Sequence, residues 1–415
     1  MPSDRAWDVV PLASLVDVDR GISYGVVQPG QHVADGVPIV RVTNVREGRI
    51  DTDEPLRVSR EIASKYNRTR LRGGELLLTL VGTVGETAIV PQSLAGWNTA
   101  RAVGVVPVLT DPGSRWVQYA LRTGLAREHV SSRQNTTVQA TLNLKDVSAL
   151  PIPMPPRRVR DSIAAVLGSL DDKIELNRKM NRTLEAMAKA VFKSWFIDFD
   201  GHDPNDLVDS ELGLIPRDWK VASLDSIADF LNGAACQKYP AVEGRPSLPV
   251  IKIRELNQGI TAETDQATAD IPAKWWVKDG DVLFSWSGSL VVKVWTGGRG
   301  ALNQHLFKVT SSMYPRWYFL LWTKHHLAEF QRIAADKATT MGHIQRHHLS
   351  NAKVLVPPKD ALDKVGGLLG PLVDRQAAND LESRTLAALR DALLPKLMSG
   401  EIRVPEVEEA VEVAA

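Results

Sequence analysis

The feature that most constrains this chain is a long helical pattern between residues 151 and 199. A proline-rich segment ends at Pro155-Pro156, and beyond it apolar residues recur at alternating intervals of four and three. This spacing is typical of a coiled-coil seam, whereas a helix lying on a globular core carries a broader apolar stripe. From Asp161 to Trp195 such a helix would be about 50 Å long and would need a partner to bury its seam. The predicted seam comprises Ile163, Leu167, Leu170, Ile174, Asn177, Asn181, Leu184, Ala188, Val191 and Trp195.

The same pattern occurs again near the C-terminus, and the two copies align without a gap. Asn379 in the second copy corresponds to Asn177 in the first, an offset of 202 residues that also relates Pro357-Pro358 to Pro155-Pro156. Each copy is apolar at its ends and polar at its centre, so the two helices would pair in one register and be penalised in others. The second predicted seam comprises Val365, Leu369, Leu372, Gln376, Asn379, Ser383, Leu386, Arg390, Leu393 and Leu397.

Weaker matches precede both helices. Residues 38–42 correspond to residues 249–253, and residues 74–82 correspond to residues 280–288. We therefore interpret the chain as a repeat of globule and helix, in preference to two unrelated domains with similar helices. The expected boundaries are 1–155 for the first globule, 156–200 for the first helix, 201–218 for a linker, 219–357 for the second globule, 358–400 for the second helix and 401–415 for a disordered tail.

Short strands are expected in the globules. In the first globule, aliphatic and β-branched runs bounded by Gly, Pro, Asn and Asp cover residues 37–45, 75–81, 88–91 and 103–109. The fold class expected from these patterns is α+β, with two mixed α/β globules and two long helices.

Composition limits the kind of protein. The 415 residues are 44% hydrophobic and 24% charged, as in ordinary globular proteins. They contain no apolar run of the roughly 18 residues needed to cross a membrane. The single cysteine, Cys236, excludes an intrachain disulfide, and with the absence of an apolar leader it favours a cytoplasmic location. The net charge of +1 is low for a protein that binds DNA unaided, so DNA binding would need local basic patches and help from a partner.

Three stretches carry residues suited to contacting DNA. Residues 57–74 are basic and suit phosphates, although a solvated helix and loop explains them equally well. Residues 133–139 lack carboxylates and contain the side-chain types that suit base edges, although a polar surface loop also fits. The spacing of His343 and His347 would suit a metal, but we favour a DNA-facing loop there. The candidate DNA-binding residues are Arg57, Arg60, Lys65, Arg68, Arg70, Arg133, Gln134, Lys337, His343 and Arg346.

No motif of a catalytic or cofactor-binding site is present. The sequence lacks a Gly-rich phosphate loop ending in Lys-Ser/Thr, a G-x-S-x-G elbow, a zinc signature and a carboxylate pair spaced for acid–base chemistry. We therefore predict no catalytic, cofactor-binding or metal-binding residue, and we favour a recognition protein over an enzyme.

Several motifs together resemble the DNA-specificity subunit of type I restriction-modification systems. They are the two proline segments with their helices, the strands Gly-Glu-Leu-Leu-Leu and Gly-Asp-Val-Leu-Phe at residues 74–78 and 280–284, and residues 211–216 (Glu-Leu-Gly-Leu-Ile-Pro) before Trp219. The resemblance covers essentially the whole chain. It implies two target-recognition domains, each reading half of a bipartite DNA site, held apart by an antiparallel coiled coil with a pseudo-two-fold axis.

The resemblance also implies partners. Two methyltransferase subunits would bind S-adenosylmethionine, restriction subunits would use ATP and Mg, and this chain would have no catalytic activity and no cofactor of its own. Because the two globules differ in sequence, we expect the DNA site to be asymmetric. Two alternatives remain open, a coiled-coil adaptor that never meets DNA and a free-standing DNA-modifying enzyme with an unrecognised site.

Overall fold

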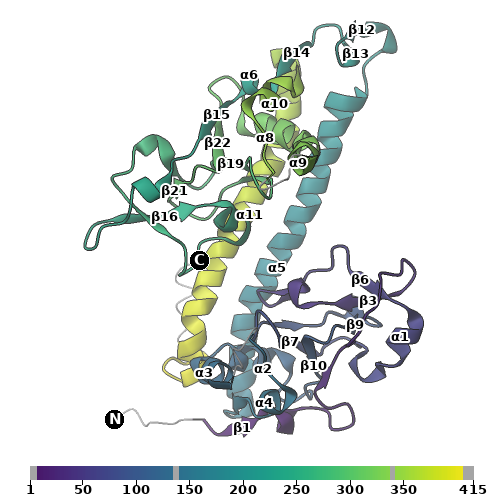
Figure 1. Ribbon diagram of the computed structural model, residues 1–415, viewed down its shortest axis with the longest axis vertical. Coiled ribbons are helices and arrows are strands. Elements are labelled where there is room, and N and C mark those ends of the chain that lie inside the picture. The colour runs from purple at the N-terminus through teal and green to yellow at the C-terminus, as the bar shows by residue number, and fades with distance from the viewer. Residues whose placement is uncertain (1–6, 134–139, 337–341, 405–415) are drawn as a thin grey trace. The chain divides into compact units, whose positions relative to one another are not determined.

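The computed structural model describes residues 7–133, 140–336 and 342–404. Contacts divide the chain into two compact units, the first formed by residues 1–172 and 387–415 and the second by residues 173–386. Two long helices, α5 (Arg157–Lys193) and α11 (Lys359–Ser399), each contribute one part to either unit (Figure 1). Both begin directly after the predicted proline pairs. A π-helical turn at Ser194–Asp198 follows α5.

The first unit contains a four-stranded antiparallel sheet and a three-stranded mixed sheet. The four-stranded sheet has the order β2-β10-β7-β8, formed by Ser23–Tyr24, Val103–Val106, Leu76–Thr79 and Thr87–Ile89. The mixed sheet has the order β6-β3-β9, formed by Leu56–Val58, Val37–Val40 and Asn98–Thr99, and its β3 and β9 run parallel. Two-stranded pairs join β1 (Val9–Pro11) with β11 (Pro151–Pro153) and β4 (Val45–Arg46) with β5 (Arg49–Ile50).

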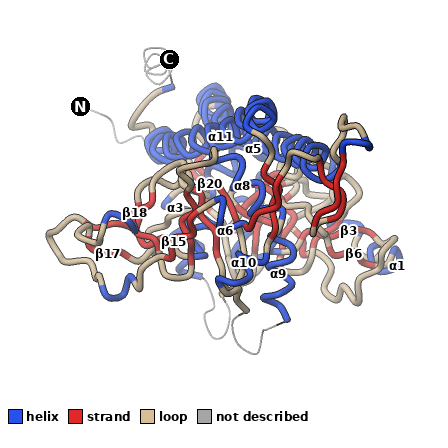
Figure 2. The backbone as a smooth tube through the Cα atoms, turned by 90° about the horizontal axis from the view of Figure 1, so that it is seen from above, coloured by secondary structure: helices blue, strands red, loops and turns tan. Residues whose placement is uncertain are grey.

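Short helices surround these sheets. They are α1 (Arg60–Ser64), α2 (Ser114–Leu121), α3 (Gly124–Arg133) and α4 (Leu144–Ser148). Helix α1 lies beside β3 and β6, as Figure 2 shows, because Ile62 and Ala63 pack on the buried side chains of Ile39 and Val58.

The second unit repeats this architecture. Its four-stranded sheet has the order β15-β22-β19-β20, formed by Asp229–Asn232, Leu306–Thr310, Val282–Ser285 and Val292–Val294. Its mixed sheet has the order β17-β16-β21-β18, formed by Gln266–Thr268, Ser247–Ile251, Gly300–Leu302 and Trp276–Val277, and its β16 and β21 run parallel. Strand β14 (Lys220–Ser223) pairs with β23 (Lys353–Val356). The helices are α6 (Leu224–Ile227), α7 (Ile253–Gln258), α8 (Arg316–His325), α9 (Leu327–Asp336) and α10 (Arg346–Asn351).

The matching strand orders extend the sequence repeat to the fold. The antiparallel order β2-β10-β7-β8 corresponds to β15-β22-β19-β20, and the parallel pair β3-β9 corresponds to β16-β21. The chain is therefore a mixed α/β protein with an internal repeat. The predicted linker contains an antiparallel hairpin, β12 (Leu207–Ser210) and β13 (Gly213–Pro216).

Each unit buries a core to which both long helices contribute. In the first unit Trp116 and Tyr119 of α2 pack with Leu167 of α5 and Leu397 of α11. In the second unit the corresponding core is richer in aromatic rings, and it includes Phe192 of α5, Trp322 of α8 and Leu369 of α11. Within the described residues, no helix is long and apolar enough to cross a membrane.

Candidate nucleic-acid interface

Residues 57–72 of the first unit, here called the basic loop, form an exposed surface on a rigid base. The base is a buried ion pair in which Arg20 Nη1 lies 2.8 Å from Glu75 Oε1. Arg20 Nη2 also donates to the carbonyl of Arg70 at 3.1 Å, and Glu75 accepts from the backbone N–H of Arg72 at 2.8 Å. A buried pair is favourable when its remaining donors and acceptors are satisfied. Here the loop backbone bonds to Arg20 Nη2 and to Glu75, whereas Arg20 Nε has no partner among the described residues. These contacts tie the backbone of Arg70 and Arg72 to the pair.

The predicted cations of the basic loop differ in whether their side chains already bond to other parts of the protein. Arg57 donates to the carbonyl of Gly36 at 3.1 Å, Lys65 pairs with Glu61 at 3.0 Å, and Arg68 donates to the carbonyl of Arg20 at 2.7 Å. Arg60 and Arg70 are exposed, and among the described residues neither has an ion-pair partner. Both line a hollow of about 470 Å³. Among the predicted contact residues of the basic loop, Arg60 and Arg70 are thus the cations most available to phosphate.

A second group of polar residues lies where the parallel strands end, and we call it the strand-end site. In the first unit Val40 of β3 is in register with Thr99 of β9, so Arg41 and Arg101 follow at the same edge. Both side chains are exposed, and in the part of the chain that the structure describes neither has an ion-pair partner. The prediction from sequence missed both residues. The signal for Arg41 was the repeat match between residues 38–42 and 249–253.

The strand-end site of the second unit has the same frame and different side chains. Ile251 of β16 is in register with Leu302 of β21, and Lys252 and Gln304 follow. Lys252 pairs with Asp265, which lowers the pKa of that carboxyl. The site therefore presents mainly neutral donors and acceptors near Gln304.

An aromatic and polar group adjoins Gln304. Trp286 Nε1 donates to Asn232 Oδ1 at 3.0 Å and to the carbonyl of Gln304 at 3.1 Å. Ser287 Oγ lies 3.0 Å from His305 Nδ1. Trp286 therefore holds the backbone of Gln304, and Ser287 holds the side chain of the residue that follows it.

The remaining predicted contact residues are dispersed. The backbone of His343 forms an isolated antiparallel β-bridge with that of Ser287. The ring centroid of His343 lies 6.3 Å from that of Trp286, so this side chain lies beside the second strand-end site. Arg346 donates to the carbonyl of Phe230 at 3.2 Å, which ties its guanidinium to the sheet. Arg133 is exposed and contacts His129 at 3.0 Å. Gln134 and Lys337 lie outside the described residues. Among those described, no group of three His, Cys, Asp or Glu side chains is placed to hold a metal.

The polar centres of α5 and α11 meet within the second unit. Asn177 Nδ2 donates to Glu382 at 2.9 Å, and Asn181 Nδ2 donates to Asp380 at 2.8 Å. Asn379 Nδ2 donates to Asn181 Oδ1 at 2.8 Å. Asn181 follows Asn177 on α5, while its partner Asp380 precedes Glu382 on α11, so these two segments run in opposite directions. Burial raises the pKa of Asp380, against the opposing effect of Lys293.

The predicted seam positions are buried or half-buried in the unit to which each belongs. The buried ones are Ile163, Leu167, Ile174, Asn177, Ala188, Val365, Leu369, Asn379 and Leu397. The half-buried ones are Leu170, Asn181, Leu184, Val191, Trp195, Leu372, Gln376, Ser383, Leu386, Arg390 and Leu393.

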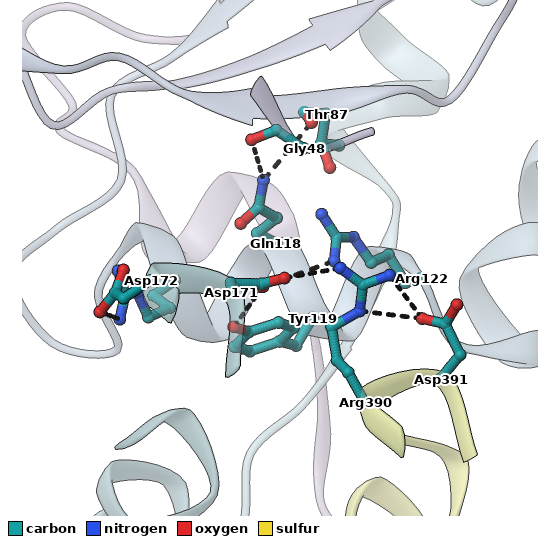
Figure 3. Close-up of polar contacts among 10 residues, drawn as sticks. Gly48, Thr87, Gln118, Tyr119, Arg122, Asp171, Asp172, Arg390 and Asp391 are labelled. Carbon is teal, nitrogen blue, oxygen red and sulfur yellow. Dashed lines mark hydrogen bonds and ion pairs between the residues drawn. The ribbon is translucent and has the colours of Figure 1, made fainter. Parts of the chain in front are cut away.

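In the first unit a carboxylate on α5 joins α2 and α11 (Figure 3). Asp171 accepts from the hydroxyl of Tyr119 at 2.7 Å and from Arg390 Nη1 at 2.6 Å, and Arg122 Nη1 lies 3.8 Å away. Burial, followed by the charge of Asp171, raises the pKa of Tyr119. Beside this group, Asp172 pairs with Arg115, as Asp374 pairs with Arg316 in the second unit.

Comparisons with known proteins agree with this two-part organisation. Residues 6–186 and 216–371 match the family model described as the type I restriction modification DNA specificity domain. The chain is 26% identical over 351 residues to the type I restriction enzyme MjaIX specificity subunit of Methanocaldococcus jannaschii, covering 80% of this chain and 79% of that protein. It is 28% identical over 222 residues to the type I restriction enzyme EcoBI specificity subunit of Escherichia coli, covering 51% of this chain and 46% of the relative.

A solved structure has a similar fold. The S subunit of a type I restriction-modification system from M. genitalium superposes with a TM-score of 0.54 at 12% identity, covering 96% of this chain and 97% of that one. At this identity the likeness is one of fold.

Proposed function

We propose, since the chain belongs to the family of type I restriction-modification DNA specificity proteins, that its two units each read one half of a bipartite, asymmetric DNA site. The observation that carries this proposal is the pair of strand-end sites. They share one backbone frame, yet one presents Arg41 and Arg101 and the other presents Lys252 and Gln304. Arg41 and Arg101 are exposed, whereas Lys252 and Gln304 are half-buried. A frame that is kept while the polar side chains at its edge differ is suited to reading two different sequences with one architecture.

The long helices would serve as the scaffold between the two readers. We propose that α5 and α11 form an antiparallel coiled coil with a pseudo-two-fold axis, and that its length sets the spacing of the half-sites. Their hydrogen-bonded polar centres and their buried seam positions support this arrangement. In this proposal residues 1–155 and 219–357 are the target-recognition domains, and residues 201–218 link the repeats.

The chain would act as the non-catalytic subunit of a larger cytoplasmic complex. Two methyltransferase subunits would bind S-adenosylmethionine, and restriction subunits would bind ATP and Mg. The net charge of +1 supports a division of labour in which partners supply much of the contact with phosphate.

Methylation mapping tests this function. The chain is produced with its methyltransferase subunits in a host that lacks other modification systems, and methylated sites are read by sequencing. We expect one asymmetric bipartite motif. Exchange of residues 1–155 for the matching segment of a relative should change one half of that motif and leave the other half intact. Purified complex that binds no duplex would support the adaptor alternative instead.

A further inference from the structure

We propose that Arg101 and Gln304 are specificity-determining residues at corresponding positions, and that Arg101 reads a G·C pair in one half-site while Gln304 reads an A·T pair in the other. This inference rests on the proposed function, and it names the side chains and the base pairs through which the two units differ.

The two residues correspond by register as well as by sequence. Arg101 lies two residues after β9 ends and two before β10 begins, and Gln304 has the same position between β21 and β22. Strand β10 starts with Val103 opposite Thr79, and β22 starts with Leu306 opposite Ser285.

Matching backbone hydrogen bonds hold both connections. The N–H of Ala100 donates to the carbonyl of Val40 at 2.8 Å, and the N–H of Asn303 donates to the carbonyl of Ile251 at 3.1 Å. The N–H of Val103 donates to Ala100 at 2.9 Å, as that of Leu306 donates to Asn303 at 3.0 Å. Each pair of bonds brackets the proposed reading residue, so its Cα is fixed by the sheet.

A glycine passes each connection at close range. A Cβ placed on Gly25 would lie 2.0 Å from the carbonyl oxygen of Thr99, and one on Gly233 would lie 2.7 Å from that of Leu302, which corresponds to Thr99. Only glycine permits this approach. The backbone therefore passes the two connections in a similar way.

The side chains at the two positions have different preferred partners among the bases. Arginine donates two parallel hydrogen bonds to O6 and N7 of guanine, whereas glutamine pairs with N6 and N7 of adenine. Arg101 is exposed, and no carboxylate among the described residues competes for its guanidinium. The neighbouring cation Arg41 suits a phosphate contact that would set the register of Arg101 on the duplex.

The surroundings of Gln304 favour neutral recognition. The backbone carbonyl of Gln304 accepts from Trp286. The side-chain Nε2 lies 3.4 Å from His305 Nε2, a long contact that a better partner would displace. Lys252 at the same edge is already paired with Asp265. The amide of Gln304 is thus the group in this connection suited to reading a base through both a donor and an acceptor.

A competition experiment on the methyltransferase complex tests the inference. The methylated motif of the wild-type complex is determined first. Its affinity is then measured for duplexes in which each base pair of the motif is replaced in turn, and the measurement is repeated with Arg101→Gln and Gln304→Arg. The control is Arg158→Gln, which removes an exposed arginine of α5 that has no ion-pair partner among the described residues.

We expect Arg101→Gln to change the preference at one position of one half-site from G·C to A·T, by about 10-fold to 100-fold in relative affinity. Gln304→Arg should make the reverse change at one position of the other half-site, and Arg158→Gln should change neither. Uniform weakening on all duplexes by Arg101→Gln would identify a phosphate contact and overturn the inference. An unchanged motif, or an equal change with the control, would also overturn it. A wild-type complex with no bipartite motif would instead refute the proposed function.

Discussion

Asp171 of α5 and Arg390 of α11 form an ion pair at 2.6 Å, and the same carboxylate accepts from Tyr119 of α2. One side chain thus joins the first globule to segments of both long helices. The repeat gives the second unit Val373 at the corresponding position, where it is buried in an aromatic core. At this one position the two units therefore attach their globules to the helices by different means, an ion pair in the first and apolar packing in the second.

The Asp171 contact predicts an asymmetric loss of stability. Asp171→Asn removes the charge that balances Arg122 and Arg390, and we expect the first unit to lose about 2 kcal/mol of unfolding free energy. Chemical denaturation followed by fluorescence measures this loss. Asp172→Asn is the matched control, because Asp172 is 63% exposed against 25% for Asp171 and should cost less than about 1 kcal/mol. Equal losses in the two variants would contradict the role given to Asp171.

The polar centre of the helices predicts that substitutions at Asn181 and Asn379 have non-additive effects on stability. Asn379 is buried, its amide nitrogen donates to Asn181, and its Oδ1 has no partner among the described residues. Asn181→Leu would leave the whole Asn379 amide without a partner, at a cost of about 1 to 3 kcal/mol. Adding Asn379→Leu should restore part of that stability, since it removes the stranded group. A double variant less stable than Asn181→Leu would refute the prediction.

Two buried tyrosines predict loss of stability at high pH. Burial, followed by Asp171, raises the pKa of Tyr119, and burial, followed by Tyr314, raises that of Tyr318, both from an ordinary value of 10.0. Because the folded state holds these protons more tightly, their contribution is complete below pH 10.0 and falls as the pH rises above it. Each tyrosine should add a slope of about 1.4 kcal/mol per pH unit.

Unfolding measured from pH 9 to 11 in Tyr119→Phe and Tyr318→Phe checks this slope. Each variant should lose stability at neutral pH and show a shallower decline at alkaline pH. A decline as steep as that of the wild type in both variants would show that other groups control alkaline unfolding.

Local sequence patterns predicted the long helices and their polar centre. Features that depend on contacts between segments far apart in the chain were not predicted. The alternation of four and three is visible within α5 itself, so Asn177 and Asn379 were identified as polar seam positions. The parallel pairing of β3 with β9 joins segments that are far apart in the chain, and the strand-end site at Arg101 was missed as a result. Arg68 was expected to face phosphate, but its guanidinium also donates to the carbonyl of Arg20, 48 residues earlier, a contact that no spacing reveals.

The basic loop predicts how DNA affinity depends on salt. Arg70→Ala removes an exposed cation whose backbone is held by Arg20, so affinity should fall on every duplex and the slope of log K against log salt should decrease by about 0.9. Arg68→Ala should have a second effect that Arg70→Ala lacks. It releases the carbonyl of Arg20, so it should also lower the unfolding temperature. Titrations of the assembled complex from low to high salt, with Arg158→Ala as control, separate the two effects. An unchanged slope in Arg70→Ala would show that the basic loop is a solvated surface away from the duplex.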